Sequence, residues 1–299
     1  MIKATLMGLR LSCLTLFVAS AFAADDLPRS VDAVPDGNVS IENTAGSVDV
    51  RGWSRNQVEV SGSLGADVEE LVVERDGRNV VVRVEIPDRK SRRRHISSDL
   101  VVRVPERSSV NVDGVSSDLT VSGVKGALRL KTVSGDIEAQ GFEADLDAET
   151  VSGDVLVEGS GRANRSRLHS VSGDVEARNL SGEIEAGAVS GDVIVRHGRF
   201  GTVRIETVTG DVEFEGELLG NGRMDLETVN GEVDVTFTGS LSARFEIETF
   251  NGDIDNCFGP QPTRQSRYAP GKQLVFTEGD GGARVTIQTL NGDLTLCKQ

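Results

Sequence analysis

The sequence predicts an all-β fold, a parallel β-solenoid in which coils of about 20 residues, each with two short strands, stack on one another. The first observation is a unit of the type Val-Ser-Gly-Asp-Val, clearest around residues 133–137, that returns along the chain. The second is the spacing of its glycines, which lie 18 to 21 residues apart until a last gap of 40. These repeat glycines are Gly135, Gly153, Gly173, Gly191, Gly210, Gly231, Gly252 and Gly292.

Alternation of apolar and polar residues on both sides of each glycine indicates the two strands. Seven, five and three residues before the glycine stand apolar residues or Thr, as in Leu128, Leu130 and Thr132. Two and four residues after the glycine stand apolar residues, as in Ile137 and Ala139. Such alternation is typical of half-buried strands. The alternative is a chain of antiparallel hairpins that form a sandwich or a barrel.

The corner between the two strands is predicted from the residue two before the glycine, which is also apolar. We expect the side chains at this position, as in Val133, Val151 and Phe250, to point inward. Two successive residues, the Thr and the apolar residue after it, would then both point inward, which breaks the alternation of a strand. The chain must therefore bend there. The repeat glycines are expected to hold backbone conformations or close approaches that a Cβ would disturb.

Residues 1–23 are predicted to be a secretory signal peptide. Lys3 and Arg10 form its basic start, residues 11–21 are mostly apolar, and a small-residue cleavage site would leave Ala24 as the first mature residue. No later segment is apolar enough to cross a membrane. The sequence therefore predicts an exported protein without a transmembrane segment, which is periplasmic or secreted to the cell surface.

Residues 24–105 are predicted to form an N-terminal β region that caps the stack, because terminal repeats of stacked proteins are atypical. This region holds a weak first copy of the repeat at 37–50 and a hairpin at 70–86. Residues 106–299 would form the repeat solenoid. An excursion rich in Pro, Gly and Arg is expected to interrupt it at 256–275.

One basic run stands in an otherwise acidic chain. The formal net charge of −15 argues against a nucleic acid as partner. The run predicts an anion-binding patch for lipid headgroups or acidic glycan, and a solvated loop between strands is the alternative. The residues of this patch are Arg89, Lys90, Arg92, Arg93 and Arg94.

A Val-x-Val-Pro strand that ends at Pro105, followed by many Val-Ser-Gly-Asp-Val units, resembles the bacterial putative adhesin family. These exported adhesin-like domains are related to the head GIN-type adhesin domains. Residues 48–53, 279–283 and 291–294 fit the same pattern, so that the resemblance runs from about Gly37 to Leu296. It implies a β-rich domain of the cell envelope and names no reaction.

No catalytic motif points to a reaction. The chain carries no zinc-protease, nucleophile-elbow or phosphate-loop motif. We therefore expect a non-catalytic binding or scaffold protein of the cell envelope, without a cofactor, whose partner is a glycan, a lipid headgroup or a protein. The alternative is a polysaccharide-active β-helix enzyme that uses paired carboxylates. The Asp after each glycine, as in Asp136, either caps turn amides or binds calcium between coils.

Cys257 and Cys297 are predicted to form a disulfide, because they alone remain after signal cleavage and export leads to an oxidising compartment. Each lies five residues after its repeat glycine. If the residues between them made a full coil, their Cα atoms would lie ~9.6 Å apart, too far for a bridge. If 258–272 is instead an excursion and 274–276 an added strand, the two coils are neighbours. The bond would then lock the C-terminal edge of the stack.

Overall fold

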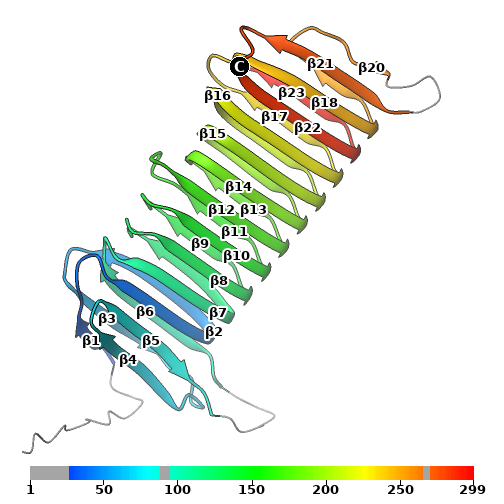
Figure 1. Cartoon of the computed structure of the whole chain (residues 1–299). Helices are drawn as coiled ribbons and strands as arrows, with labels where there is room; N and C mark the ends of the chain where they lie inside the picture. Colours follow the sequence, from blue (N-terminus) through cyan, green and yellow to red (C-terminus); the bar gives the residue numbers. More distant parts are fainter. Residues whose placement is uncertain (1–26, 88–94, 265–269) are drawn as a thin grey trace, which may run out of the picture.

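The computed structural model describes residues 27–87, 95–264 and 270–299, and every regular element in these ranges is a β-strand. The strands form an elongated stack with the N-terminal strands at one end and the C-terminal strands at the other (Figure 1). The prediction of an all-β fold is therefore confirmed. The signal peptide expected at 1–23 and the basic run from Arg89 to Arg94 lie outside the described residues.

The regular part of the stack is built from coils with two strands each. A first strand ends at the Ser-Gly corner, and a shorter second strand begins two residues after the glycine. The first strands are β8 (Leu128–Ser134), β10 (Leu146–Ser152), β12 (Ala163–Ser172) and β14 (Ser181–Ser190). The second strands are β9 (Ile137–Gln140), β11 (Val155–Glu158) and β13 (Val175–Arg178). In β15 (Val193–Thr209) and β16 (Val212–Asn230), the second strand of one coil continues into the first strand of the next.

Each of these strands pairs in parallel with the equivalent strand one repeat away. Leu130 of β8 is the register partner of Ala148 of β10, which in turn is the partner of Leu168 of β12. The second strands pair in the same way, as in β9, β11 and β13. This parallel pairing contradicts the antiparallel-hairpin alternative for the repeats. Stacking is necessary because one coil cannot bury its apolar face alone.

The core lies between the two ladders of strands. Each ladder contributes one layer of side chains to it. The alternating residues of both strands fill it, so that Leu130 and Ala139 are fully buried. Toward the C-terminal end the core contains a column of aromatic rings. Phe200, Phe214 and Phe237 follow one another with ring centroids 5.8 and 6.1 Å apart.

The C-terminal coil lies inside the stack and not at its end. β17 (Val233–Phe237), β18 (Ala243–Asn251) and β19 (Ile254–Asn256) follow β16 in the sequence. However, β22 (Ala283–Asn291) pairs with β16 on one side and β18 on the other. β23 (Leu294–Lys298) likewise lies between β17 and β19. The last coil of the chain is therefore intercalated between two earlier ones, as the red strands of Figure 1 show.

An antiparallel strand covers the outer coil. β21 (Lys272–Glu278) pairs with β18, and β20 (Thr263–Arg264) pairs with β21. Phe276 of β21 stacks on Phe245 of β18 with centroids 4.4 Å apart, and so closes the end of the core. The added strand expected at 274–276 is confirmed. The coil of β18 and β19, covered by β21, forms the C-terminal edge of the stack.

The N-terminal end is closed in the same manner. β2 (Asn38–Trp53) pairs in parallel with β7 (Ser109–Ser122) on its inner side. On its outer side it pairs with β5 (Asn79–Glu85) and β6 (Ser98–Pro105). The antiparallel strands at this end are β4 (Glu70–Asp76) on β5, β3 (Gln57–Ser63) on β6, and β1 (Arg29–Asp32) on β3. The predicted hairpin is confirmed as β4 and β5, while the weak first repeat, β2, is a full member of the stack.

Candidate functional site

The apolar residue two before each repeat glycine points outward, and the prediction that it lies in the core is wrong. Val133 is 49% exposed, whereas Thr132 before it and Ile137 after the corner are buried. The reason is that the chain turns the corner over four exposed or half-exposed residues, 133–136. The alternation of buried and exposed side chains therefore stops at Thr132 and begins again at Ile137. The turn therefore presents the side chain of Val133 to solvent.

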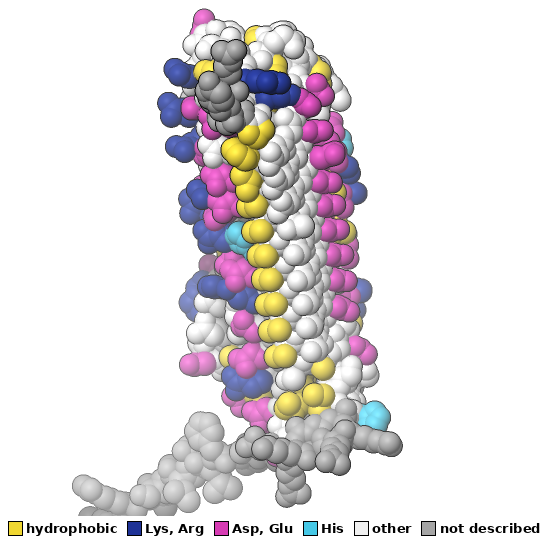
Figure 2. Space-filling model, turned by 90° about the vertical axis from the view of Figure 1, so that its right-hand side faces the viewer, with side chains coloured by type: hydrophobic (Ala, Val, Ile, Leu, Met, Phe, Trp, Pro, Cys, Tyr) yellow, Lys and Arg dark blue, Asp and Glu magenta, His cyan; other side chains and the backbone are white. Residues whose placement is uncertain are grey.

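Stacking aligns these outward side chains into one row, which we call the apolar ladder. Its members are 38 to 50% exposed and lie on neighbouring strands of the parallel ladder. In the order of the stack they are Val115, Val133, Val151, Val171, Val189, Val208, Val229, Leu290 and Phe250. Figure 2 shows the ladder as a continuous yellow row along the narrow edge of the stack.

A second row on the same edge consists of carboxylates, and we call it the acidic ladder. Its members follow the repeat glycines, or Ser117 in the first coil, and in Figure 2 a pale band separates them from the apolar ladder. In the order of the stack they are Asp118, Asp136, Asp154, Asp174, Asp192, Asp211, Glu232, Asp293 and Asp253. One edge of the molecule thus carries an apolar row and an acidic row with the same repeat.

Hydrogen bonds between coils explain the acid at this position. The backbone N–H of Asp154 donates to Oδ1 of Asp136 at 2.9 Å, and that of Asp174 donates to Oδ1 of Asp154 at 2.8 Å. The same contact recurs in other coils, including the outer one, where the N–H of Asp253 donates to Oδ1 of Asp293. These contacts agree with the interpretation that the Asp residues cap turn amides.

Buried hydroxyl groups fix the corner from the inside. The Oγ1 of Thr150 donates to the carbonyl oxygen of Gly135 in the neighbouring coil at 3.1 Å, and the Oγ of Ser170 donates to that of Gly153 at 2.9 Å. The bond gives a partner to a partly buried carbonyl oxygen, and an unpaired acceptor there would be costly. In these coils the hydroxyl three residues before the glycine therefore bonds to the corner, whereas the buried Oγ1 atoms of Thr228 and Thr289 have no hydrogen-bond partner.

The repeat glycines allow the coils to approach closely at the corner. Gly173 has a φ of 151°, and a Cβ built on it would collide with the carbonyl oxygen of Gly153 in the neighbouring coil. The obstacle is backbone that belongs to the parallel ladder, so a side chain there cannot be accommodated by a rotamer change. The close approach of the coils therefore requires glycine.

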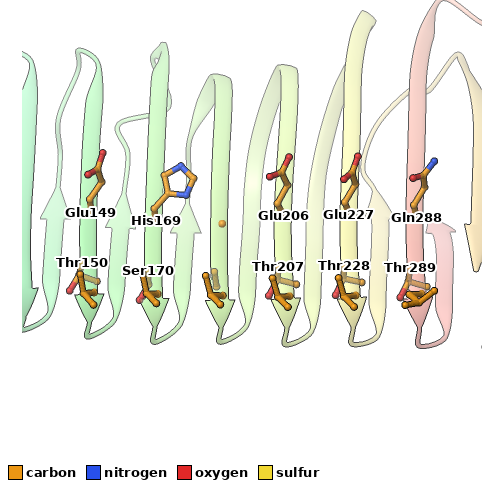
Figure 3. Close-up of a pocket in the computed structure, with 18 of the residues that line it drawn as sticks. Glu149, Thr150, His169, Ser170, Glu206, Thr207, Glu227, Thr228, Gln288 and Thr289 are labelled. Atoms are coloured by element: carbon orange, nitrogen blue, oxygen red, sulfur yellow. The ribbon is translucent and has the colours of Figure 1, made fainter.

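A groove of about 1100 Å³ runs along the stack beside the apolar ladder. One wall is the apolar ladder, and the floor consists of the residues three before the glycines. We call the other wall the polar row, and Figure 3 shows five of its side chains standing in line above the Thr and Ser residues. In the order of the stack its residues are Lys131, Glu149, His169, Gly187, Glu206, Glu227, Gln288 and Glu248.

The polar row differs in charge between its two halves. At the N-terminal end, Lys131 donates to Glu149 at 2.6 Å and lowers the pKa of that carboxyl. Gly187 interrupts the row at its middle. Beyond Gly187 the charged residues of the row are the acids Glu206, Glu227 and Glu248.

Charged residues on the broad faces pair with one another between neighbouring coils. Examples are Arg165 with Glu183 at 2.9 Å and Arg196 with Glu213 at 2.6 Å. The pairing with Arg196 lowers the pKa of Glu213. Exposed pairs of this kind contribute at most ~1 kcal/mol each, and they help to hold neighbouring coils in register. The broad faces thus use their charges within the stack, whereas the corner edge presents its side chains to solvent.

The two cysteines meet at the C-terminal end. Cys257 follows β19 and Cys297 belongs to β23, and these two strands are neighbours in the stack. The structure joins the two residues by a disulfide with Cα atoms 4.9 Å apart. The predicted adjacency of the two coils is therefore confirmed.

Among the residues that the structure describes, no group of three or more His, Cys, Asp or Glu side chains is placed to hold a metal ion. Within the same ranges, no helix is long and apolar enough to span a membrane. The predicted anion-binding patch from Arg89 to Arg94 lies outside these ranges. Within the described ranges, the candidate functional site is the corner edge with its groove.

A family model described as Toastrack DUF4097 matches residues 36–297. The match covers the whole stretch on which the sequence resembles adhesin-like domains, and the predicted resemblance is confirmed. No curated protein matches the chain.

Similar solved structures include a putative adhesin from Bacteroides fragilis NCTC 9343, which is 14% identical with a TM-score of 0.48, over 90% of this chain and 95% of that one. Another is a putative adhesin from Parabacteroides merdae ATCC 43184, which is 11% identical with a TM-score of 0.28, over 91% of this chain and 95% of that one. Similarity at this level does not identify what the chain binds.

Proposed function

We propose that this chain, which belongs to the Toastrack DUF4097 family, is an exported adhesin-like protein that binds a component of the cell envelope and catalyses no reaction. The observation that carries the proposal is the apolar ladder. Nine exposed apolar side chains form one row along the stack, where the core does not need them. Extended exposed apolar patches on folded proteins mark interaction sites.

The form of the stack supports a scaffold role. Eight spacings of ~4.8 Å between paired strands give the apolar ladder a length of ~38 Å. Parallel backbone pairing holds its members at fixed positions. Binding of a partner therefore costs little conformational entropy in this surface. In this proposal the chain is a β-solenoid that acts as a rigid support for the row.

Export is part of the proposal. The basic start, the apolar stretch and the small-residue site before Ala24 are those of a cleaved signal peptide. The protein would then act in the periplasm or at the cell surface, where envelope components are within reach. The exported form is expected to begin at Ala24, which N-terminal sequencing checks.

The apolar ladder should be needed for association with the envelope. Replacement of Val171, Val189 and Val208 by Ser removes apolar contact area worth ~1 kcal/mol or more per residue, so binding should weaken on the order of tenfold to a hundredfold. The measurement is the fraction of purified mature protein that sediments with envelopes from a strain lacking it. Cross-linking in the native envelope then identifies the attached component.

Leu156→Ser is the matched control, because Leu156 is also an exposed apolar residue, 37% exposed, but lies on β11 away from the corner edge. This variant should sediment like the wild type. Equal loss of association in the control and in the ladder variant would contradict the proposal, since it would show non-specific apolar adhesion.

The basic run is proposed as a second, electrostatic contact. Replacement of Arg92, Arg93 and Arg94 by Gln should weaken association with anionic envelope fractions at low salt and leave thermal unfolding unchanged. The difference from the wild type should shrink as salt screens the charges. Identical sedimentation of the two proteins at low salt would show that the run is only a solvated loop.

A further inference from the structure

We propose that the C-terminal half of the apolar ladder, from Val189 to Phe250, is the docking site for a basic amphipathic α-helix of a partner protein. This inference rests on the proposed binding function of the ladder and names the chemistry of its partner. Three features of the corner edge carry it: the size of the apolar side chains, the charge on both sides of them, and the spacing of the coils.

The apolar contact is largest in this half. The ladder consists of valines up to Val229, but its last two members are Leu290 and Phe250, which are 47% and 46% exposed. The register of β16, β22 and β18 places these three residues on successive strands. A partner that lies along the row therefore gains more apolar contact here than over the valines near Val133.

Acids flank the row on both sides in this half. Glu206 and Glu227 of the polar row lie on one side, and Asp211, Glu232 and Asp293 of the acidic ladder lie on the other. Glu206 pairs with Arg204, and Asp253 in the coil of Phe250 pairs with Lys272. Within the described ranges, no Lys or Arg lies within ion-pair distance of Glu227 or of these three members of the acidic ladder.

The N-terminal half offers a weaker acidic field. Its polar row carries Lys131, which is bound to Glu149, and His169. Charge complementarity therefore selects a cationic partner and the C-terminal half. A second copy of this chain is disfavoured, because it would bring the same acids against one another.

The spacing of the coils favours a helix over an extended peptide. Successive ladder residues are ~4.8 Å apart, whereas same-face side chains of an extended strand recur every ~6.8 Å. The turns of an α-helix recur every ~5.4 Å, and an inclination of roughly 25–30° brings them into step with the coils. The inclination also shifts the helix sideways from coil to coil. After about four coils this shift equals the ~10 Å width of the helix, which then no longer covers the row.

The polar row lacks one side chain where such a helix would cross it. Gly187 has no side chain, and Ala188 beside it replaces the Thr or Ser of the other coils. In Figure 3 the strand between His169 and Glu206 shows no side chain in the polar row. A helix that lies over Val208 and Val229 and leaves the ladder near Val189 would meet the imidazole of His169 there, because a Cβ on Gly187 would lie 3.0 Å from its Nδ1.

The test uses a labelled synthetic helix of about 18 residues, ~27 Å long, made of Leu on one face and Lys on the other. Fluorescence anisotropy measures its binding to the mature chain at low and physiological salt. A peptide of the same composition in scrambled order, without an apolar face, should bind at least about tenfold more weakly.

Variants locate the site. Val208→Ser with Val229→Ser should weaken helix binding about tenfold, and Glu206→Gln with Glu227→Gln should weaken it severalfold and reduce its salt dependence. The matched N-terminal pair, Val133→Ser with Val151→Ser, should change binding less than about twofold. Thermal unfolding monitored by circular dichroism shows that each variant remains folded.

Several results would overturn the proposal. They are equal binding of the scrambled peptide, an equal effect of the N-terminal pair, unchanged binding after the Glu replacements, or dimers of the chain that the Val208 and Val229 replacements abolish. If the helix fails to bind while envelope sedimentation still depends on the ladder, the helical partner is wrong and the proposed function stands. If sedimentation is also independent of the ladder, both are wrong.

Discussion

Replacement of Gly173 by Val should lower the free energy of unfolding by about 2–6 kcal/mol. Residue 173 has a φ of 151° and would need a conformation that costs a β-branched residue ~1–3 kcal/mol. In addition, the Cβ would collide with the carbonyl oxygen of Gly153, and overpacking of this kind adds ~1–3 kcal/mol. The colliding atom is backbone, so relief requires the two coils to move apart.

The damage should extend beyond one contact. The carbonyl oxygen of Gly173 itself lies where a Cβ on Gly191 would be, so the corner is tightly packed on both sides of this coil. In a stack, each coil is stabilised mainly by its neighbours, and a separated pair weakens the interface on which the following coils depend. Urea unfolding followed by circular dichroism measures the loss.

Gly161→Val is the control that separates the two causes. Gly161 has a φ of 77°, but a Cβ on it would meet nothing within 4 Å. This variant should show only the backbone strain, ~1–3 kcal/mol. If the two variants unfold at the same urea concentration, the close approach of the coils at Gly173 costs nothing to relieve and our account of the repeat glycine is wrong.

The strands and their pairing could be predicted from the sequence because both follow from a strict physical period. Leu128 and Leu130 alternate with Arg129 and Lys131, and a slip of one residue would turn both leucines to solvent. The constant interval between repeat glycines then places each strand beside its counterpart. Leu146 pairs with Leu128 for this reason.

The orientation of the apolar ladder could not be predicted in the same way. Val133 is apolar, and apolar residues next to a buried strand usually extend the core. The available signal was the interval between Thr132 and Ile137, both buried, which leaves four residues for a corner. A valine that recurs inside such a corner is not needed by the core. This recurrence is the signal in the sequence that predicts the apolar ladder.

The order of the coils at the ends also could not be predicted. The coils of Gly231, Gly252 and Gly292 share the alternation of apolar and polar residues and the Asn-Gly corner, so the repeat pattern alone does not distinguish one neighbour from another. What decides the order is how the open end of the core is covered. β21 brings Phe276 onto Phe245, and this leaves β22 to enter between β16 and β18.

Removal of the disulfide, by Cys257→Ser with Cys297→Ser, should destabilise the C-terminal end by roughly 4 kcal/mol. The bond closes a loop of 40 residues, and the chain-entropy estimate for a loop of this length gives that value. The bond joins the outer coil, at the end of β19, to the intercalated coil in β23. Without it, the excursion and β21 can separate from the stack together with the outer coil.

The expected unfolding therefore begins at one end. In the double variant, limited proteolysis should cut the segment between β19 and β22 at a urea concentration at which the coils from β8 to β14 remain protected, since stability in stacked repeats is local. Reduction of the wild type should reproduce this behaviour, and the same reductant should leave the variant unchanged.

The intercalated position of β22 and β23 makes this test informative about topology as well. A coil at a free edge could detach alone, but a coil held between two others can leave only if the outer one moves first, and the bond fixes the outer coil to it. Non-reducing mass spectrometry of exported protein decides whether the bond forms: two free thiols would refute it. If the bond forms but its removal leaves the proteolysis pattern unchanged, the parallel ladders on both sides of β22 suffice to hold the C-terminal end.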